Sequence, residues 1–255
     1  MKVHPDTSIR IANSETVSLE LDSDVTLSQA RLYLRSGDVV AVDLADNTFD
    51  FPIFAAPTTV KIGWFESSSD DAVFTSYAEV VSRHYFTLEQ LSGFDGGRDD
   101  FGDLPIEMQY AARQAATEVF EEASGRSFVA RIGRTKDYGR SSLLVLDHHD
   151  IRELLTPGYV QVSDSQLERR PGCGPFPRWV EYVYGAPVMP AEVSRAVLEL
   201  AAYTLRPSNR PIGATGESTD AGYIHYTIAG RDGATAIPEV NAAIQQFGAG
   251  EHYVW

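Results

Sequence analysis

Apolar and polar residues alternate along the first third of the chain, in short runs separated by turn residues. Alternation of this kind places one side of a run in a core and the other in solvent, which is typical of β-strands. No helical pattern lies between the runs. We therefore expect a small antiparallel sandwich or barrel. The predicted strands are 17–21, 30–34, 39–44, 48–54, 59–65 and one or two within 73–86.

A helical period begins near residue 103, where apolar residues recur at steps of three and four. Asp103 can cap the N-terminus of this helix, and Pro105 suits its first turn. Gly125 suits the left-handed residue that ends a helix. The predicted helix therefore lies within 103–128. Its predicted buried face contains Ile106, Ala112, Ala115, Ala116, Val119, Phe120 and Ala123.

Two further helices are predicted in the second half of the chain, at 191–205 and 238–247. The runs 128–139, 142–147, 153–162 and 178–185 have the character of strands. The first of these two helices has Val193, Val197, Leu200, Ala201 and Thr204 on one face. The second carries the apolar residues Val240, Ala243, Ile244 and Phe247.

These elements predict an α+β protein, with a helical core that contains inserted β-strands and an all-β N-terminal domain before it. Residues 92–102 are rich in glycine and aspartate and have no apolar period, so they are interpreted as a linker. The predicted division is a β-rich accessory domain at 1–91, the linker at 92–102, and a helical domain with a C-terminal tail at 103–255.

The composition excludes several classes of function. The net charge is −15, with 21 Lys and Arg against 36 Asp and Glu, which argues against a protein that grips nucleic acid by neutralising phosphates. No apolar run approaches the length that spans a bilayer, and the first residues lack the apolar core of a secretory signal. We therefore expect synthesis in the cytoplasm. Cys173 is the only cysteine, so neither an internal disulfide nor a Cys-rich zinc site is possible.

The segment LDHHD contains four residues that can bind metals: Asp147, His148, His149 and Asp150. Adjacent residues on a strand or helix point in different directions, however, so two neighbouring imidazoles do not converge on one ion without a special turn. We expect a polar turn between strands here, and a metal-dependent hydrolase is the alternative. The sequence indicates no catalytic constellation, no cofactor site and no metal site elsewhere.

A series of sequence blocks carries a resemblance to a known family. IEMQYAARQAATEVFEEASGRSF is followed by WVEYVYG, the link APVMP, AEVSRAVLELAAYTL, the loop RPSNRPIG and IPEVNAAIQQF. In this order, over residues 104–247, the blocks resemble the head-to-tail adaptor (head–tail connector) family of tailed viruses. The motifs are structural, and the order of the blocks is more specific than any one of them.

This resemblance implies a non-enzymatic virion protein in the neck, made in the host cytoplasm and without contact with a membrane. Copies of the chain would form a closed ring, usually twelvefold, with the portal protein above and a stopper or tail-completion protein below. Genomic DNA would pass through the lumen without specific binding. The family offers no role for the N-terminal β domain, which we expect to decorate the outside of the neck. A surface or receptor-binding virion module is the other alternative for this domain.

Two sets of residues are candidates for the function that the resemblance implies. An acidic lumen would repel DNA phosphates, and the lumen-lining candidates are Glu107, Glu118, Glu121 and Glu122. A solvated outer face is the alternative for these carboxylates. The final helix and tail are expected to dock on the portal, with Ile244, Phe247, Tyr253, Val254 and Trp255 as contact candidates. The alternative for the tail is packing against the chain's own core.

Overall fold

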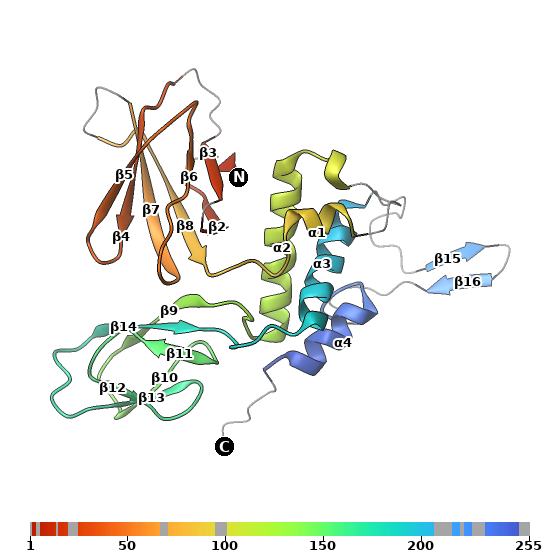
Figure 1. Ribbon diagram of the computed structural model, residues 1–255. Coiled ribbons are helices and arrows are strands. Elements are labelled where there is room, and N and C mark those ends of the chain that lie inside the picture. Colours follow the sequence, from red (N-terminus) through yellow and green to blue (C-terminus); the bar gives the residue numbers. More distant parts are fainter. Residues whose placement is uncertain are drawn as a thin grey trace. The chain divides into compact units, whose positions relative to one another are not determined.

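The computed structural model describes residues 2–3, 6–13, 15–19, 25–66, 71–94, 101–206, 216–219, 222–225 and 233–249. Within these ranges the chain combines several β-sheets with four α-helices, which confirms the predicted α+β class (Figure 1). The chain forms two compact units. The first, called the β unit, combines Met1–His84 with Ser127–Pro187. The second, called the helical unit, combines Tyr85–Arg126 with Val188–Trp255.

This division differs from the predicted one, in which a linker at 92–102 separates two consecutive domains. The chain leaves the β unit at His84, returns to it at Ser127 and leaves it again after Pro187. The strands of 127–187 are therefore inserted between the parts of the chain that form the helical unit. Residues 95–100 of the predicted linker lie outside the described residues.

Two sheets form the N-terminal part of the β unit. The larger sheet has the strand order β2-β8-β7-β4-β5, and the smaller has the order β1-β3-β6. The pairs β2–β8 and β1–β3 are parallel, so the pairing is not wholly antiparallel as predicted. The strands are β1 Lys2–Val3, β2 Ser8–Ala12, β3 Thr16–Leu19, β4 Gln29–Leu34, β5 Val39–Asp43, β6 Thr48–Asp50, β7 Thr58–Phe65 and β8 Phe74–Val81.

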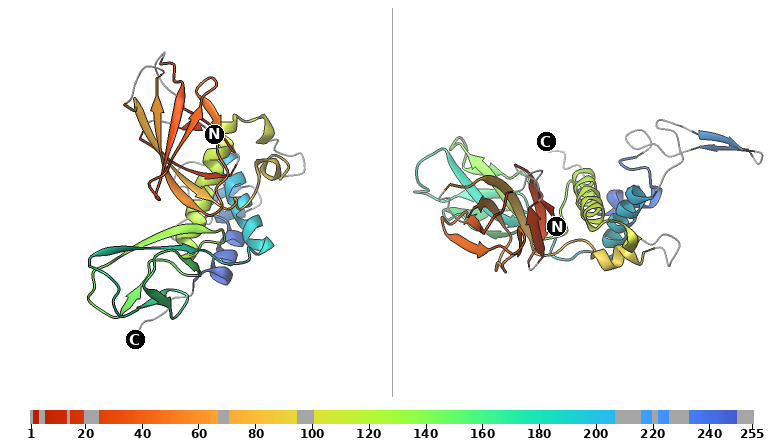
Figure 2. Two further views of the ribbon diagram at one scale, coloured as in Figure 1. Left: turned by 60° about the vertical axis from the view of Figure 1, so that its left-hand side comes forward. Right: turned by 90° about the horizontal axis from the view of Figure 1, so that it is seen from above.

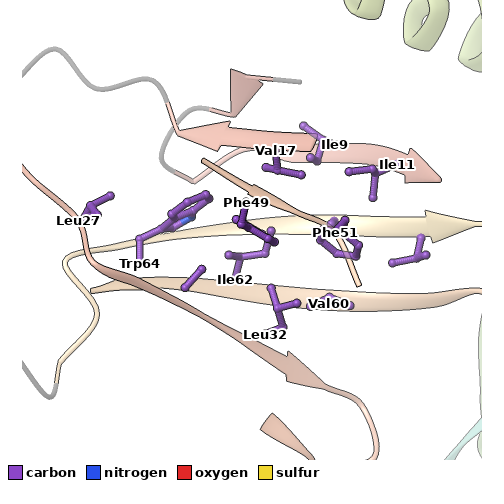
Figure 3. Packing of buried hydrophobic residues seen from close by; sticks show 13 residues of the cluster. Ile9, Ile11, Val17, Leu27, Leu32, Phe49, Phe51, Val60, Ile62 and Trp64 are labelled. Carbon is purple, nitrogen blue, oxygen red and sulfur yellow. The ribbon is translucent and has the colours of Figure 1, made fainter. Parts of the chain in front are cut away.

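The two sheets share one apolar core, as in a β-sandwich (Figure 3). Val17 and Phe49 from the smaller sheet lie in the same cluster as Leu32 and Ile62 from the larger one. At the centre, the fully buried Trp64 packs edge-on against Phe49, with 5.6 Å between ring centroids. The alternating pattern of the sequence therefore places its apolar positions in this core.

The second part of the β unit contains two three-stranded antiparallel sheets, with the orders β11-β14-β9 and β10-β13-β12. Their shared core is rich in tyrosine and includes Tyr159, Tyr182 and Tyr184. The strands are β9 Arg131–Asp137, β10 Leu143–Val145, β11 Ile151–Leu154, β12 Tyr159–Gln161, β13 Gln166–Arg169 and β14 Arg178–Tyr184.

The helical unit is built around three helices, α2 Ile106–Ser124, α3 Ala191–Leu205 and α4 Pro238–Phe247. They pack against one another and lie side by side in Figures 1 and 2. A short helix, α1 Leu88–Ser92, precedes them. The other described elements of this unit are the 3₁₀ turn η1 Phe101–Asp103 and the strand pair β15 Gly216–Thr219 and β16 Gly222–His225. In the described part of the chain, no helix combines the length and apolar character that crossing a bilayer requires.

The ends of the helices test the sequence predictions. The observed bounds of α3 and α4 are those predicted, and Gly125 ends α2 in the left-handed conformation with φ of 63°. The predicted cap at Asp103 is wrong, because Asp103 lies in η1 and Pro105 occupies the N-cap position without a side-chain hydrogen bond. A proline before the first helical residue stops the preceding turn from continuing into α2.

The predicted buried face of α2 is wrong in part. Ala112, Ala116 and Phe120 are buried, but Ile106 and Val119 are 46% and 41% exposed. Polar residues complete the buried face instead: Gln109, Arg113, Thr117, Glu121 and Ser124. Several of these polar groups bond within the unit. Gln109 donates to the carbonyl of Leu104 at 3.0 Å, and Thr117 donates to that of Arg113 at 2.8 Å. On α3, Thr204 shares a predicted face with Val193, Val197, Leu200 and Ala201, but it is exposed whereas these four are buried.

Candidate interaction surfaces

One side of α2 combines exposed apolar side chains with carboxylates. We call this set the α2 outer face: Met108, Ala111, Ala115, Glu118, Val119 and Glu122. Met108, Ala111, Ala115, Glu118 and Glu122 follow one another at steps of three and four, and Val119 lies four residues after Ala115, so the set shares a side of the helix. All six are exposed, with Met108 at 49% and Val119 at 41%. Exposed apolar side chains next to charges are typical of a surface that another protein covers.

The four predicted lumen-lining carboxylates of α2 have different environments. Glu118 and Glu122 are exposed, and Glu107 is half-buried. Glu121 is buried, and its Oε1 accepts a hydrogen bond from the hydroxyl of Tyr85 at 2.9 Å. An internal hydrogen bond of this kind holds the carboxylate in the core, so Glu121 is removed from the candidate lining.

The predicted portal contacts at the C-terminus also divide. Ile244 is buried in the packing of α4, and Phe247 is half-buried. The chain after α4 is held to α2, because the amide of Ala249 donates to the carbonyl of Ser124 at 2.8 Å. Ile244 therefore stabilises the unit itself rather than offering a free contact surface. Tyr253, Val254 and Trp255 lie outside the described residues.

A second surface lies on β9 and β14, and sequence reasoning missed it. On β9, Thr135 and Asp137 point inward, whereas Arg134 is exposed and Lys136 half-buried. Trp179 of β14 pairs with Lys136 in the sheet register and is 44% exposed. We call the following set the cation–aromatic strip: Arg134, Lys136, Tyr138, Arg140 and Trp179. The signal in the sequence is the placement of its first four members at every second position, 134 to 140.

The members of the strip contact one another through cation–π interactions. The guanidinium of Arg134 lies 4.0 Å from the ring centroid of Trp179, and the Nζ of Lys136 lies 5.6 Å from it. Lys136 and Arg140 flank the ring of Tyr138 at 5.2 and 5.7 Å. These contacts hold the cations over rings that remain partly open to solvent, with Tyr138 58% exposed.

An ion pair between a buried carboxylate and a partly exposed arginine holds β9 in place beneath the strip. Asp137 is 3% exposed, and both of its oxygens lie 2.8 Å from Nη2 of Arg169. The same carboxylate accepts from the hydroxyl of Tyr159 and from the amide of Gly139, each at 2.8 Å. Burial alone would raise the pKa of Asp137, but these hydrogen bonds outweigh it and hold the pKa below its usual value. Burial and the neighbouring carboxylate raise the pKa of Tyr159, which keeps it a donor.

The LDHHD segment forms a turn between β10 and β11, as predicted. His148 Nδ1 lies 2.9 Å from the hydroxyl of Tyr182, and its ring stacks on Tyr184 at 3.9 Å. Asp147 accepts from Thr135 at 2.7 Å, whereas His149 Nδ1 lies 3.9 Å from Asp164. The hydroxyls of Thr135 and Tyr182 lie 3.0 Å apart, so Asp147 and His148 belong to one hydrogen-bond network within the core. Among the described residues, no group of three His, Cys, Asp or Glu is placed to hold a metal, so this segment gives no support to the hydrolase alternative.

Comparison with protein-family models and with curated proteins gave no match. Two of the solved structures to which the chain is similar come from gene transfer agent particles. One is a chain from the neck of an empty particle computed with C6 symmetry, at 16% identity and a TM-score of 0.38, covering 50% of this chain and 82% of that chain. The other is from the virion of the native particle, at 18% identity and a TM-score of 0.40, covering 65% and 90%. Scores at this level do not establish a common overall fold.

Proposed function

We propose that the protein is a structural component of a virion neck, a head-to-tail adaptor that forms a ring beneath the portal and joins the capsid to the stopper or tail. One observation carries the proposal. The helices formed by the adaptor-like sequence blocks, α2, α3 and α4, pack together as one unit although 66 residues separate Ser124 from Ala191. The strands of 127–187 are inserted between them, which is the arrangement that the resemblance implies.

The α2 outer face supports a role in assembly. A ring requires each copy to bind its neighbour through two different surfaces, and an exposed helix face with apolar side chains is suited to one of them. The apolar positions Met108 and Val119 are exposed in the single chain. Burying them against a neighbour would contribute to association through the hydrophobic effect.

The acidic composition supports passage of DNA without a grip on it. A net charge of −15 leaves few cations to replace the counterions of DNA. We place Glu107, Glu118 and Glu122 among the candidates for the lumen or for a subunit contact, since their carboxylates are not buried. A basic channel surface in the assembled ring would contradict the proposal that DNA slides past repelling carboxylates.

Ile244 is buried, so it is not available to contact the portal. We therefore propose that the residues after Gly248 bind the portal. Truncation after Gly248 is expected to abolish binding to the portal protein of the same virus, measured by co-sedimentation, while the unfolding midpoint stays near that of the full chain. Ile53→Ala is the control, because it removes an exposed apolar side chain from the β unit, distant in sequence from the tail. Unimpaired binding by the truncated chain would refute the portal role of the tail.

The location of the protein in a particle tests the proposed function. An affinity tag at the N-terminus, labelled with gold and imaged by electron microscopy, is expected to lie at the junction of head and tail. We propose that the N-terminal sandwich decorates the outside of the neck, which would make this tag accessible. Gold at the tail tip would favour the receptor-binding alternative, and gold over the capsid shell would overturn the neck assignment.

A further inference from the structure

Charge is distributed unevenly along the chain. Residues 127–187 contain eight of the 21 Lys and Arg but only seven of the 36 Asp and Glu. The four α-helices contain eight glutamates and two arginines. A chain with net charge −15 therefore has one region of slight positive charge, and the cation–aromatic strip lies on the surface of this region.

The strip and the α2 outer face have complementary chemistry. The strip offers two exposed aromatic rings, Tyr138 and Trp179, flanked by three cations. The α2 outer face offers exposed apolar side chains, Met108 and Val119, flanked by the carboxylates of Glu118 and Glu122. Tryptophan, tyrosine and arginine are the residues that most often dominate the binding energy of protein interfaces.

Two alternate cations of the strip match the spacing of the α2 carboxylates. Arg134 and Lys136 lie at alternate positions of the edge strand β9, about 6.6 Å apart, and Glu118 and Glu122 lie one helical turn, about 5.4 Å, apart. Lys136 and Arg140 are four residues apart, about 13 Å along an extended chain, so their long side chains must converge to reach both carboxylates. The apolar residues of α2 would then lie against the aromatic rings.

DNA fits the strip less well than a protein surface does. Three surface cations can release few of the counterions of DNA, whereas a protein that holds a duplex neutralises many phosphates. Part of the strip is also neutralised locally, because Arg134 Nε lies 3.9 Å from a carboxylate oxygen of Glu181. An acidic protein surface with apolar side chains satisfies both the cations and the exposed rings.

We propose that the cation–aromatic strip of one copy of this chain docks on the α2 outer face of the next copy. The contact is heterologous, because different surfaces of the two copies meet, and its repetition generates a ring when the rotation closes. This inference rests on the proposed function, in which copies of the chain surround the DNA. Electrostatic attraction sets the register of neighbouring copies, and burial of the rings stabilises the contact.

Lysine chemistry gives a direct test, because Lys136 is one of only three lysines, with Lys2 and Lys61. A carbodiimide adds to a glutamate carboxyl group and forms an O-acylisourea. The Lys136 amine attacks its acyl carbon, an amide bond forms, and the acyl C–O bond breaks to release the carbodiimide as a urea. An equal mixture of ¹⁵N-labelled and unlabelled full-length protein is crosslinked and analysed by mass spectrometry. Peptides joining Lys136 to Glu118 or Glu122 are expected in mixed-isotope form. Their absence, or links only within one isotope, would overturn the proposal.

Charge reversal tests the same contact by association. Lys136→Glu with Arg140→Glu, or Glu118→Lys with Glu122→Lys, is expected to weaken self-association at least tenfold, measured by sedimentation equilibrium at low salt. Mixing the two double variants is expected to restore association, because the charges are complementary again. The control for the strip variant, Lys61→Glu with Arg83→Glu, changes exposed residues outside both surfaces and makes the chain more negative by the same amount. Circular dichroism confirms that each variant folds.

The possible failures are distinguishable. Equal weakening by the control, or no restoration in the mixture, would overturn the docking contact. Loss of binding to a short DNA duplex in the strip variant, with self-association unchanged, would assign the strip to nucleic acid instead. Either result would overturn the docking contact without changing the position of the gold label at the neck. A gold label elsewhere would overturn the proposed function, whereas a confirmed crosslink between copies would still support the docking contact.

Discussion

The two parts of the β unit are stabilised by different kinds of interior. The N-terminal sandwich has a mainly apolar core around Trp64, whose indole N–H donates to the buried Ser76 at 2.8 Å. The second part contains tyrosine hydroxyls and the buried carboxylate of Asp137, which binds Arg169. An apolar core is insensitive to protonation, whereas a buried carboxylate is stable only while its partners and charge remain.

The difference also affects what each surface can do. The polar interior of the second part fixes the orientation of β9, because Asp137 is held on the inner side of the strand, between the half-buried Lys136 and the exposed Tyr138. A fixed strand presents Arg134 and Lys136 to solvent in a defined order. We infer that the ion pair of Asp137 preorganises the strip above it, a role that apolar packing in the sandwich does not need to supply.

The largest predicted effect is in the apolar core. Trp64→Ala removes a fully buried ring and leaves the hydroxyl of Ser76 without its donor. We expect the free energy of unfolding to fall by about 4 kcal/mol, measured by urea denaturation. Ile53→Ala, at a position that is 77% exposed, is the control and should change it by less than about 0.5 kcal/mol. Equal effects of the two substitutions would contradict the assigned core.

Removing the buried carboxylate is expected to have the next largest effect. Asp137→Ala leaves Arg169 and the hydroxyl of Tyr159 without their shared acceptor. Breaking a buried pair in this way should lower the free energy of unfolding by about 3 kcal/mol. Self-association should weaken as well, because β9 loses its anchor. A variant with unchanged stability would show that the interior of this part is not held by the ion pair.

A packing substitution tests the aromatic part of the same interior. A Cβ added at Gly133 would lie 2.4 Å from Cε2 of Tyr182, whose ring is fully buried. Gly133→Ala should therefore lower the free energy of unfolding by about 2 kcal/mol. Gly93→Ala is the matched control, because its Cβ would meet only a carbonyl oxygen at 3.6 Å. Similar unfolding midpoints for both variants would contradict the close packing of β9 and β14.

The smallest predicted effect concerns pH. The folded-state pKa of Asp137 is below its usual value, so its contribution to stability is present above the unfolded pKa of about 3.9 and is lost as pH falls through the folded pKa. The stability difference between the native chain and Asp137→Asn should therefore shrink on acidification from pH 5 to pH 2. Trp64→Ala should show no such dependence relative to the native chain. If the difference in free energy of unfolding between the native chain and Asp137→Asn stays constant from pH 5 to pH 2, the charge of Asp137 does not stabilise the fold.

The predictions from sequence succeeded where local signals decide the structure. Pro190 before α3, Pro238 at the first position of α4, the apolar period within both helices and Gly125 after α2 fix helix ends without reference to the rest of the fold. The buried side of α2 was predicted poorly, because Gln109 and Glu121 are buried with hydrogen-bond partners elsewhere in the chain. Hydrophobic periodicity carries no information about such partners.

The cation–aromatic strip was not predicted, because it also depends on contacts between residues that are distant in the sequence. The strip depends on β9 pairing with β14, which brings Trp179 beside Lys136 from 43 residues away. The alternation of 134, 136, 138 and 140 marks one side of a strand, but it does not show which side faces solvent. Likewise, the return of the chain to the β unit at Ser127 depends on long-range contacts that no local motif encodes.

The central claim is that copies of this chain form a collar at the junction of head and tail. A symmetry-resolved cryo-electron microscopy reconstruction of the neck of the assembled particle tests it most directly. We expect a closed ring of this chain in which Lys136 and Trp179 of one copy lie against Glu118 and Val119 of the next. Density for the chain in the capsid shell or the tail tip, with no ring at the neck, would contradict it.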